Sequence, residues 1–288
     1  MVTISHKNTA SNKAPGQSHE TEFNGQNDGT GRSEKYIPQK IKQHDHEFNA
    51  KLRSVAGLVP NTESVDEDVF IVGHPKSGTT WLQNLVAGEF APNSLVFDLV
   101  PGHRQHYYKR YRTPSFFKSH RLPQPEYKRV IYLVRDGRDV MVSYFHHLKA
   151  VKKKEIDFLK VVTAEEVIWP YKWHEHVEAW LSNPHGAQMI IMKYEDLKSN
   201  PVKELRRFCE FVDVQREDSL LESINQKASF EKMRQKEARF GIGNRKWPDD
   251  KFFIRRGEVG SYQDEMPSDI LEMFLRDAGD TLRKLGYL

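Results

Sequence analysis

The stretch from Val69 to Trp81, Val-Phe-Ile-Val-Gly-His-Pro-Lys-Ser-Gly-Thr-Thr-Trp, constrains the fold of this chain more than any other. Its first four residues are β-branched or aromatic, and a glycine and a proline end the run, which predicts a buried strand. Apolar residues then recur at helical spacing. Because a loop between a strand and a helix leaves backbone N–H groups at the positive end of the helix dipole, the stretch predicts an anion-binding site.

The loop differs from that of nucleotide triphosphatases, which has four residues between two glycines and then Gly-Lys-Ser/Thr. Here Lys76 precedes Gly78, and no Ser or Thr follows a lysine where it would hold magnesium. A lysine in a strand-loop-helix unit also occurs for structural reasons. The whole string Pro-Lys-Ser-Gly-Thr-Thr-Trp, however, resembles the cytosolic-type sulfotransferases, whose loop holds the 5′-phosphosulfate of 3′-phosphoadenosine 5′-phosphosulfate (PAPS).

The composition fits one folded domain with a tail. A chain of 288 residues with 38% apolar content can bury one core. Residues 1–35 have almost no large apolar side chains, so we expect a disordered tail there and a single sulfotransferase domain at 36–288. The 44 basic against 40 acidic residues give too small an excess to argue for a nucleic-acid partner.

The only cysteine, Cys209, excludes an intramolecular disulfide and a cysteine-based metal cluster, and is expected to be a small buried residue. No apolar run approaches the ~20 residues of a membrane span, and the first residues lack the apolar core of a signal peptide. We therefore expect a cytoplasmic protein that does not contact a membrane.

His120 is the candidate general base, and it follows a short predicted strand that ends in polar residues. A lone histidine there is usually structural, but Lys118-Ser-His-Arg-Leu-Pro resembles the family segment Lys-Thr-His-Leu-Pro, which supplies the base. An imidazole suits this role because its pKa near 6.5 leaves it largely neutral at pH 7. The resemblance also implies that Lys118 lies near the sulfuryl oxygens. His146 and His147 are the alternatives to His120.

A second phosphate site is predicted after the buried strand 129–134. Arg135 could act as a forked donor and Ser143 as a neutral one, although a surface arginine–aspartate network is an alternative on the residues alone. Val-Arg-Asp-Gly-Arg-Asp-Val, followed by Ser-Tyr, resembles the 3′-phosphate segment of the family. Asp139 is predicted to cap the next helix.

Three later segments resemble family motifs in the same order. Tyr194 lies in Tyr-Glu-Asp, and Phe230 lies in a Ser-Phe-x-x-Met segment whose aromatic ring would sandwich adenine with Trp81. An Arg-Arg-Gly string can wrap a phosphate with side chains and backbone N–H groups. The donor-binding residues implied by the resemblance are Lys76, Ser77, Gly78, Thr79, Thr80, Trp81, Arg135, Ser143, Tyr194, Ser229, Phe230, Arg255, Arg256 and Gly257.

Two further helices are predicted. Thr163 to Glu166 has the pattern of a capping box, which indicates a helix start. From Pro267 the pattern is amphipathic. Its inward residues are expected to be Ile270, Phe274, Ala278 and Leu282.

The resemblance covers residues 68–288 and implies an α/β, P-loop-like three-layer fold, with a central, mainly parallel sheet flanked by helices and a ligand at the carboxyl ends of the strands. It implies transfer of the sulfuryl group of PAPS to a hydroxyl or amine of a small-molecule acceptor, with PAP as product. His120 would deprotonate the acceptor, Lys76 would stabilise the leaving phosphate, and no metal is expected. A P-loop nucleotide kinase and a non-catalytic nucleotide-binding module are the alternatives.

The acceptor is less constrained by the sequence. The interval from Lys76 to His120 is short for family members with long hydrophobic acceptor loops, which favours a smaller or more polar acceptor. Residues 95–113 are rich in aromatic and basic side chains, but nothing like them recurs, so we expect no nucleic acid there. The oligomeric state stays open. Candidates for the pocket wall are Tyr107, Tyr108, Tyr144, Phe145, Trp169 and Trp173.

Overall fold

The computed structural model describes residues 58–60, 63–90, 96–98, 107–110, 113–152, 155–164, 170–241, 247–248 and 250–288. All of them belong to one compact unit, Ala50–Leu288. The tail expected at 1–35 lies outside the described residues, so the predicted domain boundary at residue 36 stays a prediction.

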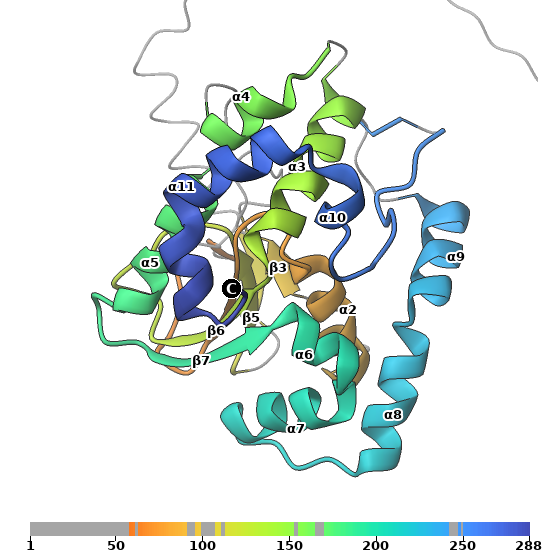
Figure 1. Ribbon diagram of the computed structural model, residues 1–288. Coiled ribbons are helices and arrows are strands. Elements are labelled where there is room, and N and C mark those ends of the chain that lie inside the picture. The colour runs from red at the N-terminus through yellow and green to blue at the C-terminus, as the bar shows by residue number, and fades with distance from the viewer. Residues whose placement is uncertain are drawn as a thin grey trace, which may run out of the picture. The chain divides into compact units, whose positions relative to one another are not determined.

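A five-stranded sheet forms the centre of this unit (Figure 1). Its order is β3-β5-β2-β6-β7, and every neighbouring pair is parallel. The strands are β2 (Val69–Val72), β3 (Val96–Asp98), β5 (Phe116–Ser119), β6 (Arg129–Val134) and β7 (Gln188–Lys193). A separate antiparallel pair is formed by β1 (Leu58–Pro60) and β4 (Tyr107–Lys109). The short apolar runs of the sequence are thus the strands of a buried parallel sheet.

Helices cover both faces of the sheet. Successive side chains of a strand point to opposite faces, so each central strand packs against both helical layers. Phe70 and Val72 join a cluster with one helical layer, and Val69 and Ile71 join a cluster with the other. The first layer contains α3 (Gly137–Val151), α4 (Phe158–Thr163), α5 (Trp173–Ser182) and α11 (Ser268–Lys284); the second contains α2 (Thr79–Phe90), α6 (Tyr194–Ser199), α7 (Pro201–Phe211) and α8 (Asp218–Lys227). This arrangement confirms the predicted three-layer α/β fold.

The segment after α8 contains two further helices, α9 (Phe230–Phe240) and α10 (Tyr262–Glu265). The predicted C-terminal helix is confirmed as α11, with all four inward residues buried. Cys209 is buried, as expected. In the parts of the chain that the structure describes, no helix combines the length and the apolar character needed to cross a bilayer.

Two predicted helix starts are wrong. The N-cap of α3 is Asp136, whose side chain accepts a hydrogen bond from the N–H of Arg138, whereas Asp139 lies in the first turn. Thr163 ends α4 rather than beginning a helix, and Ala164 follows it in the left-handed region. The next helix, α5, begins at Trp173. Both errors arose because several Ser, Thr or Asp residues near a helix end can fit the capping pattern.

The parallel register brings four chain segments together at one edge. The carboxyl ends of β5, β2, β6 and β7 are neighbours, and the residues that follow them include His120, Lys76, Arg135 and Tyr194. Ligands bind at this edge in open α/β sheets. The fold therefore positions residues from four separate sequence motifs around one place.

Candidate active site

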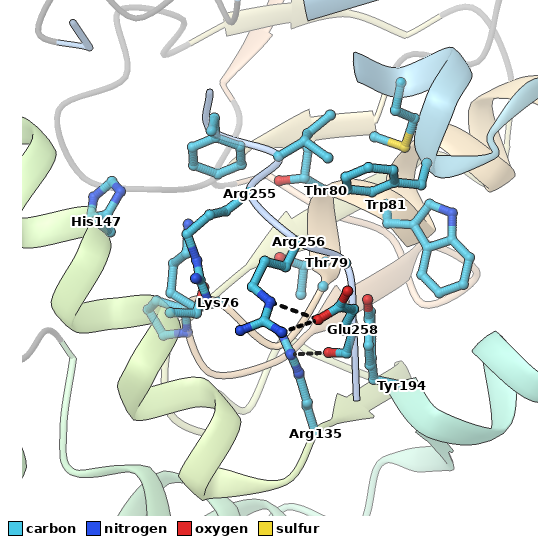
Figure 2. Close-up of a pocket in the computed structure, with 18 of the residues that line it drawn as sticks. Lys76, Thr79, Thr80, Trp81, Arg135, His147, Tyr194, Arg255, Arg256 and Glu258 are labelled. Carbon is cyan, nitrogen blue, oxygen red and sulfur yellow. Dashed lines mark hydrogen bonds and ion pairs between the residues drawn. The ribbon is translucent and has the colours of Figure 1, made fainter. Parts of the chain in front are cut away.

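A cavity of about 420 Å³ lies at the carboxyl edge of the sheet (Figure 2). It brings together most of the donor-binding and catalytic residues predicted from the sequence. Those that line it are Lys76, Gly78, Thr79, Thr80, Trp81, Lys118, His120, Arg135, Ser143, Tyr194, Phe230, Arg255, Arg256 and Gly257. Ser77 and Ser229 are absent from this lining.

The anion loop has a backbone that few residues tolerate. Lys76 and Gly78 have φ values of 75° and 96°, in the left-handed region. A Cβ at Gly78 would lie 2.6 Å from Cδ2 of Tyr194, so only glycine fits between the loop and this ring. Ser77 is buried, and its Oγ has no hydrogen-bond partner among the described residues. Its hydroxyl therefore does not reach the cavity, while its backbone stays part of the loop.

Several positively charged side chains lie near Lys76. Its Nζ is 3.8 Å from the centre of the Phe253 ring. Burial, followed by the nearby charges of Arg135, Lys118 and Arg255, lowers the pKa of Lys76 to about 7. Because these like charges repel one another, an anion placed among them would favour the protonated lysine. The electrostatics of the cavity thus suit a strongly anionic ligand.

His120 is held in one tautomer by the end of the neighbouring strand. Its Nδ1 is 2.6 Å from the carbonyl oxygen of Gly73, which can only accept a hydrogen bond. Nδ1 therefore carries a proton, and in the neutral imidazole the lone pair lies on Nε2. A neutral imidazole with a defined lone pair at the wall of the cavity can act as a general base.

A second histidine, which the sequence did not indicate, supports this arrangement. His176 on α5 donates through Nε2 to the carbonyl oxygen of His120 at 3.2 Å, and its Nδ1 accepts from the Tyr132 hydroxyl at 3.0 Å. Burial, together with nearby His74 and His120, lowers the pKa of His176 well below its usual value, so it is neutral and makes both bonds. A lone histidine on an amphipathic helix gives no sequence signal for this role.

Arg135 lies with its guanidinium over the Tyr194 ring, 4.5 Å from the centre. Its Nη2 donates to the carbonyl oxygen of Glu258 at 2.8 Å, and to Oδ2 of Asp139 at 3.3 Å (Figure 2 shows the first contact). Its Nε is buried without a partner in the described part of the chain. These contacts fix the guanidinium and leave donor capacity at the cavity.

Asp139 connects the helix after β6 to the last motif of the chain. Its carboxylate accepts hydrogen bonds from the backbone N–H of Gly260 at 2.8 Å and of Tyr262 at 2.9 Å, and from the Ser261 hydroxyl at 3.2 Å. Because Asp139 is fully buried, these bonds are needed to stabilise its charge. Asp139, predicted as a helix cap, is instead the anchor of the 257–262 loop.

A cluster of ion pairs orients the two adjacent arginines. Glu265 accepts from Arg255 at 2.7 Å, from Arg256 at 3.0 Å and from His146 at 2.7 Å. Arg256 also contacts the carboxylate of Glu258 at 2.6 Å (Figure 2). The predicted base alternative His146 is therefore engaged away from His120.

Aromatic residues form the other end of the cavity. Trp81 donates through Nε1 to the carbonyl oxygen of Ala228 at 3.0 Å, and its ring meets Tyr194 edge to face. A Cβ at Gly257 would lie 2.6 Å from Cδ2 of Phe230, so glycine lets the phosphate motif approach this ring. Ser229 is the N-cap of α9 and accepts from Lys232 N–H at 3.3 Å, which explains why its hydroxyl does not line the cavity.

Buried Glu237 holds the loop segment that precedes Arg255. Its carboxylate accepts hydrogen bonds from the backbone N–H of Phe253 and, at 3.0 Å, from that of Ile254. Arg234 donates from the same helix to the Ile254 and Arg255 carbonyl oxygens, at 2.8 and 3.1 Å. This support could not be predicted, since Glu237 and Arg234 look like ordinary polar residues of a helix in the sequence.

Of the residues predicted for the wall of the acceptor pocket, only some line the cavity. Tyr144 lines the cavity, whereas Phe145 stacks on Phe158 and Trp173 is buried against Phe274. The side chains of Tyr107, Tyr108 and Trp169 lie outside the described residues. His147, predicted only as an alternative base, also lines the cavity, and so does Lys198, which the sequence did not indicate.

The fold and the cavity define an α/β protein of the P-loop-like class whose basic cavity suits an anion. The chain belongs to the sulfotransferase family, because residues 66–286 match the family model described as a sulfotransferase domain. It is therefore a transferase enzyme. Among the residues that the structure describes, no group of three or more His, Cys, Asp or Glu side chains could hold a metal ion.

Similar relatives carry sulfotransferase names, and solved structures share the fold. Sulfotransferase 1E1 of Bos taurus is 28% identical over 251 residues, 75% of this chain and 83% of that protein. The amine sulfotransferase of Oryctolagus cuniculus is 26% identical over 251 residues, 73% of this chain and 79% of its own. The structure of mouse sulfotransferase SULT7A1 complexed with PAP has a TM-score of 0.59 at 20% identity, covering 78% and 90% of the two chains. A retinol dehydratase complex with retinol and PAP has a TM-score of 0.61 at 22% identity, covering 78% and 83%.

Proposed function

We propose that this enzyme transfers the sulfuryl group of PAPS to a hydroxyl or amine of a small-molecule acceptor and releases PAP. The observation that carries the proposal is the presence of Lys76 and of His120, protonated at Nδ1, at the wall of one basic cavity. Two structural neighbours, SULT7A1 and retinol dehydratase, were solved in complex with PAP. The family membership of the chain makes the same nucleotide the first candidate here.

The residues of the cavity fit a nucleotide with two phosphate groups. The loop around Lys76 suits the 5′ end, and Arg135 with Ser143 and the Arg255 motif suits the 3′-phosphate. The Arg135 guanidinium, held by Glu258 and Asp139 at the wall of the cavity, would donate its remaining N–H groups to a phosphate. Trp81 and Phe230 supply aromatic rings for the adenine.

PAPS supplies the sulfuryl group, which is bonded to the oxygen of its 5′-phosphate. In the proposed reaction the acceptor atom forms a bond to sulfur while the bond from sulfur to the phosphate oxygen breaks. His120 takes the acceptor proton at Nε2. Lys76 and Lys118 stabilise the negative charge that develops on the phosphate and sulfuryl oxygens. The protein thus supplies position, a base and fixed positive charge.

The expectations of a cytoplasmic location, a small-molecule acceptor without nucleic acid, and independence from metal are part of this proposal. Lysines and backbone N–H groups of the loop would take the role that magnesium has in phosphoryl transfer. The retinol dehydratase complexes contain retinol or androsterone beside PAP, and neither molecule is assigned to this chain.

Calorimetric titration of the EDTA-treated protein with PAP tests the proposal, with ATP and magnesium as the second ligand. We expect tight binding of PAP that is weakened in Arg135→Ala and Ser143→Ala but unchanged in Lys203→Gln, an exposed lysine of α7. Release of PAP from PAPS in the presence of an acceptor would complete the test. Preference for ATP with magnesium, or a requirement for magnesium in turnover, would overturn the proposal in favour of a kinase-like enzyme.

A further inference from the structure

A second cavity, of about 330 Å³, adjoins the first. Five residues line both cavities, so they share a wall: Lys76, Ser143, His147, Phe253 and Arg255. The residues that line the second cavity alone are His146, Lys149, Ala150, Arg234, Trp247, Lys251 and Phe252. A molecule in the second cavity would therefore lie next to the predicted site of reaction at Lys76.

The lining of the second cavity is strongly basic. It contains lysine and arginine side chains but, within the described ranges, no aspartate or glutamate. Arg255 is paired with Glu265, and Arg234 is bonded to backbone carbonyl oxygens. Lys149 and Lys251, both exposed at the rim, have no ion pair with any residue that the structure describes. Among the residues that the structure describes, no carboxylate therefore compensates the charge of these two lysines.

Aromatic side chains form the rest of the wall. The rings of His147 and Trp247 are stacked with centres 5.5 Å apart, and Phe253 meets both of them edge to face. Such a wall accepts a flat, apolar ring, while the two lysines accept an anion. Burial, and then the charge of Lys76, lowers the pKa of His147 to about 4, so this ring stays neutral and adds aromatic surface rather than charge.

We propose that the second cavity binds an acidic group of the acceptor, and that the enzyme prefers anionic aromatic or similarly compact acceptors over neutral ones. This inference rests on the proposed sulfuryl transfer. An acceptor with its acidic group at Lys149 and Lys251 would place its ring against the aromatic wall, next to Lys76, which lines both cavities. The acceptor that this cavity would recognise carries a carboxylate-like anion next to an apolar ring.

Two matched acceptors test this inference: 3-(4-hydroxyphenyl)propionate and its methyl ester, which differ mainly in charge. With PAPS as donor, we expect kcat/KM for the acid to exceed that for the ester by about fivefold to tenfold, the scale of two partly exposed ion pairs. In Lys149→Gln/Lys251→Gln, the ratio of acid to ester should fall close to one. The control, Lys203→Gln/Lys227→Gln, removes two exposed lysines that line neither cavity and should keep the wild-type ratio.

Binding measurements separate the possible failures. Calorimetry with PAP alone should give the same Kd for wild type and for Lys149→Gln/Lys251→Gln. A large loss of PAP affinity in this variant would mean that the lysines hold a donor phosphate, and would overturn the inference. Equal kcat/KM for acid and ester would also overturn it, while leaving sulfuryl transfer intact. If neither acceptor is sulfated but wild type saturated with PAP binds the acid more tightly than the lysine variant does, the cavity is an anion site and the proposed reaction is the part that fails.

Discussion

Asp139 accepts a hydrogen bond of 2.8 Å from the backbone N–H of Gly260, although the two residues lie in different motifs far apart in the sequence. Asp139 belongs to the segment after β6 that carries Arg135, and Gly260 belongs to the loop after Arg255. The predicted 3′-phosphate site is therefore built from two halves that a buried carboxylate holds together. The geometry of the site depends on a residue that does not line the cavity.

Asp139→Asn tests this dependence. The neutral amide keeps one acceptor oxygen but loses the charge-assisted bonds to Gly260 and Tyr262, so the loop should move away from Arg135. Since a hydrogen bond to a charged group contributes about 1.5–3 kcal/mol, we expect PAP affinity to fall about tenfold or more and the melting temperature to drop. Asp269→Asn, an exposed aspartate in the first turn of α11, is the control. Unchanged PAP affinity in Asp139→Asn would show that the loop is held by other contacts.

His120→Ala separates catalysis from binding. Removing the imidazole should reduce kcat by ~10²–10⁴-fold, the usual contribution of a positioned base, and leave the Kd for PAP within about threefold. Steady-state rates with PAPS and a phenolic acceptor, together with calorimetry, measure both. His185→Ala, which removes an exposed histidine, should have no effect. Turnover near the wild-type rate in His120→Ala would assign the base to another group, with His147 the first to examine.

The strands and the positions of the motifs could be predicted because short-range signals determine them. The run 69–72 is apolar, β-branched or aromatic and ended by glycine and proline, and it forms β2 with both faces buried. Once the strands are parallel, their carboxyl ends meet, so Lys76, His120, Arg135 and Tyr194 had to converge. This part of the site follows from local sequence and topology.

The supporting contacts could not be predicted in the same way. Asp139 has the sequence context of a helix cap, and only the tertiary packing of the 257–262 loop against α3 gives it three backbone or hydroxyl partners. Glu237 and His176 likewise act on residues far away in the chain. The orientation of the Ser77 and Ser229 hydroxyls could not be predicted either, because a hydroxyl near a loop can turn inward or cap a helix as well as bind a ligand; their role in donor binding stays a prediction.

Gly78→Ala tests how closely the anion loop approaches Tyr194. Alanine at φ 96° would strain the backbone, and its Cβ would also meet the tyrosine ring at 2.6 Å. Gly186 is the matched control, since it has φ 62° and nothing within 4 Å of the added Cβ. We expect Gly186→Ala to lose about 1 kcal/mol of unfolding free energy, and Gly78→Ala to lose a further ~1–3 kcal/mol from overpacking. Equal losses in urea unfolding would mean that the ring moves aside.

The lowered pKa of Lys76 makes ligand binding depend on pH. In the protein without ligand, burial and the charges of Arg135, Lys118 and Arg255 lower this pKa to about 7, so Lys76 loses its proton as the pH rises from 6 to 8. A bound phosphate favours the charged lysine and raises its pKa, so binding above pH 7 must include the uptake of a proton. We therefore expect the affinity for PAP to fall between pH 7 and pH 9, by at most about tenfold per pH unit for one proton.

Calorimetry in buffers with different ionisation enthalpies measures this uptake directly. At pH 8 the observed heat should vary with the buffer by close to one proton per PAP bound. Lys76→Arg keeps the positive charge throughout this range, because an arginine side chain does not lose its proton in proteins, and so it should bind PAP without the pH dependence. Lys198→Arg is the control, since Lys198 also lines the cavity but lies exposed at its edge. If the pH dependence persists in Lys76→Arg, the proton belongs to a different group, and Lys76 is charged before the ligand binds.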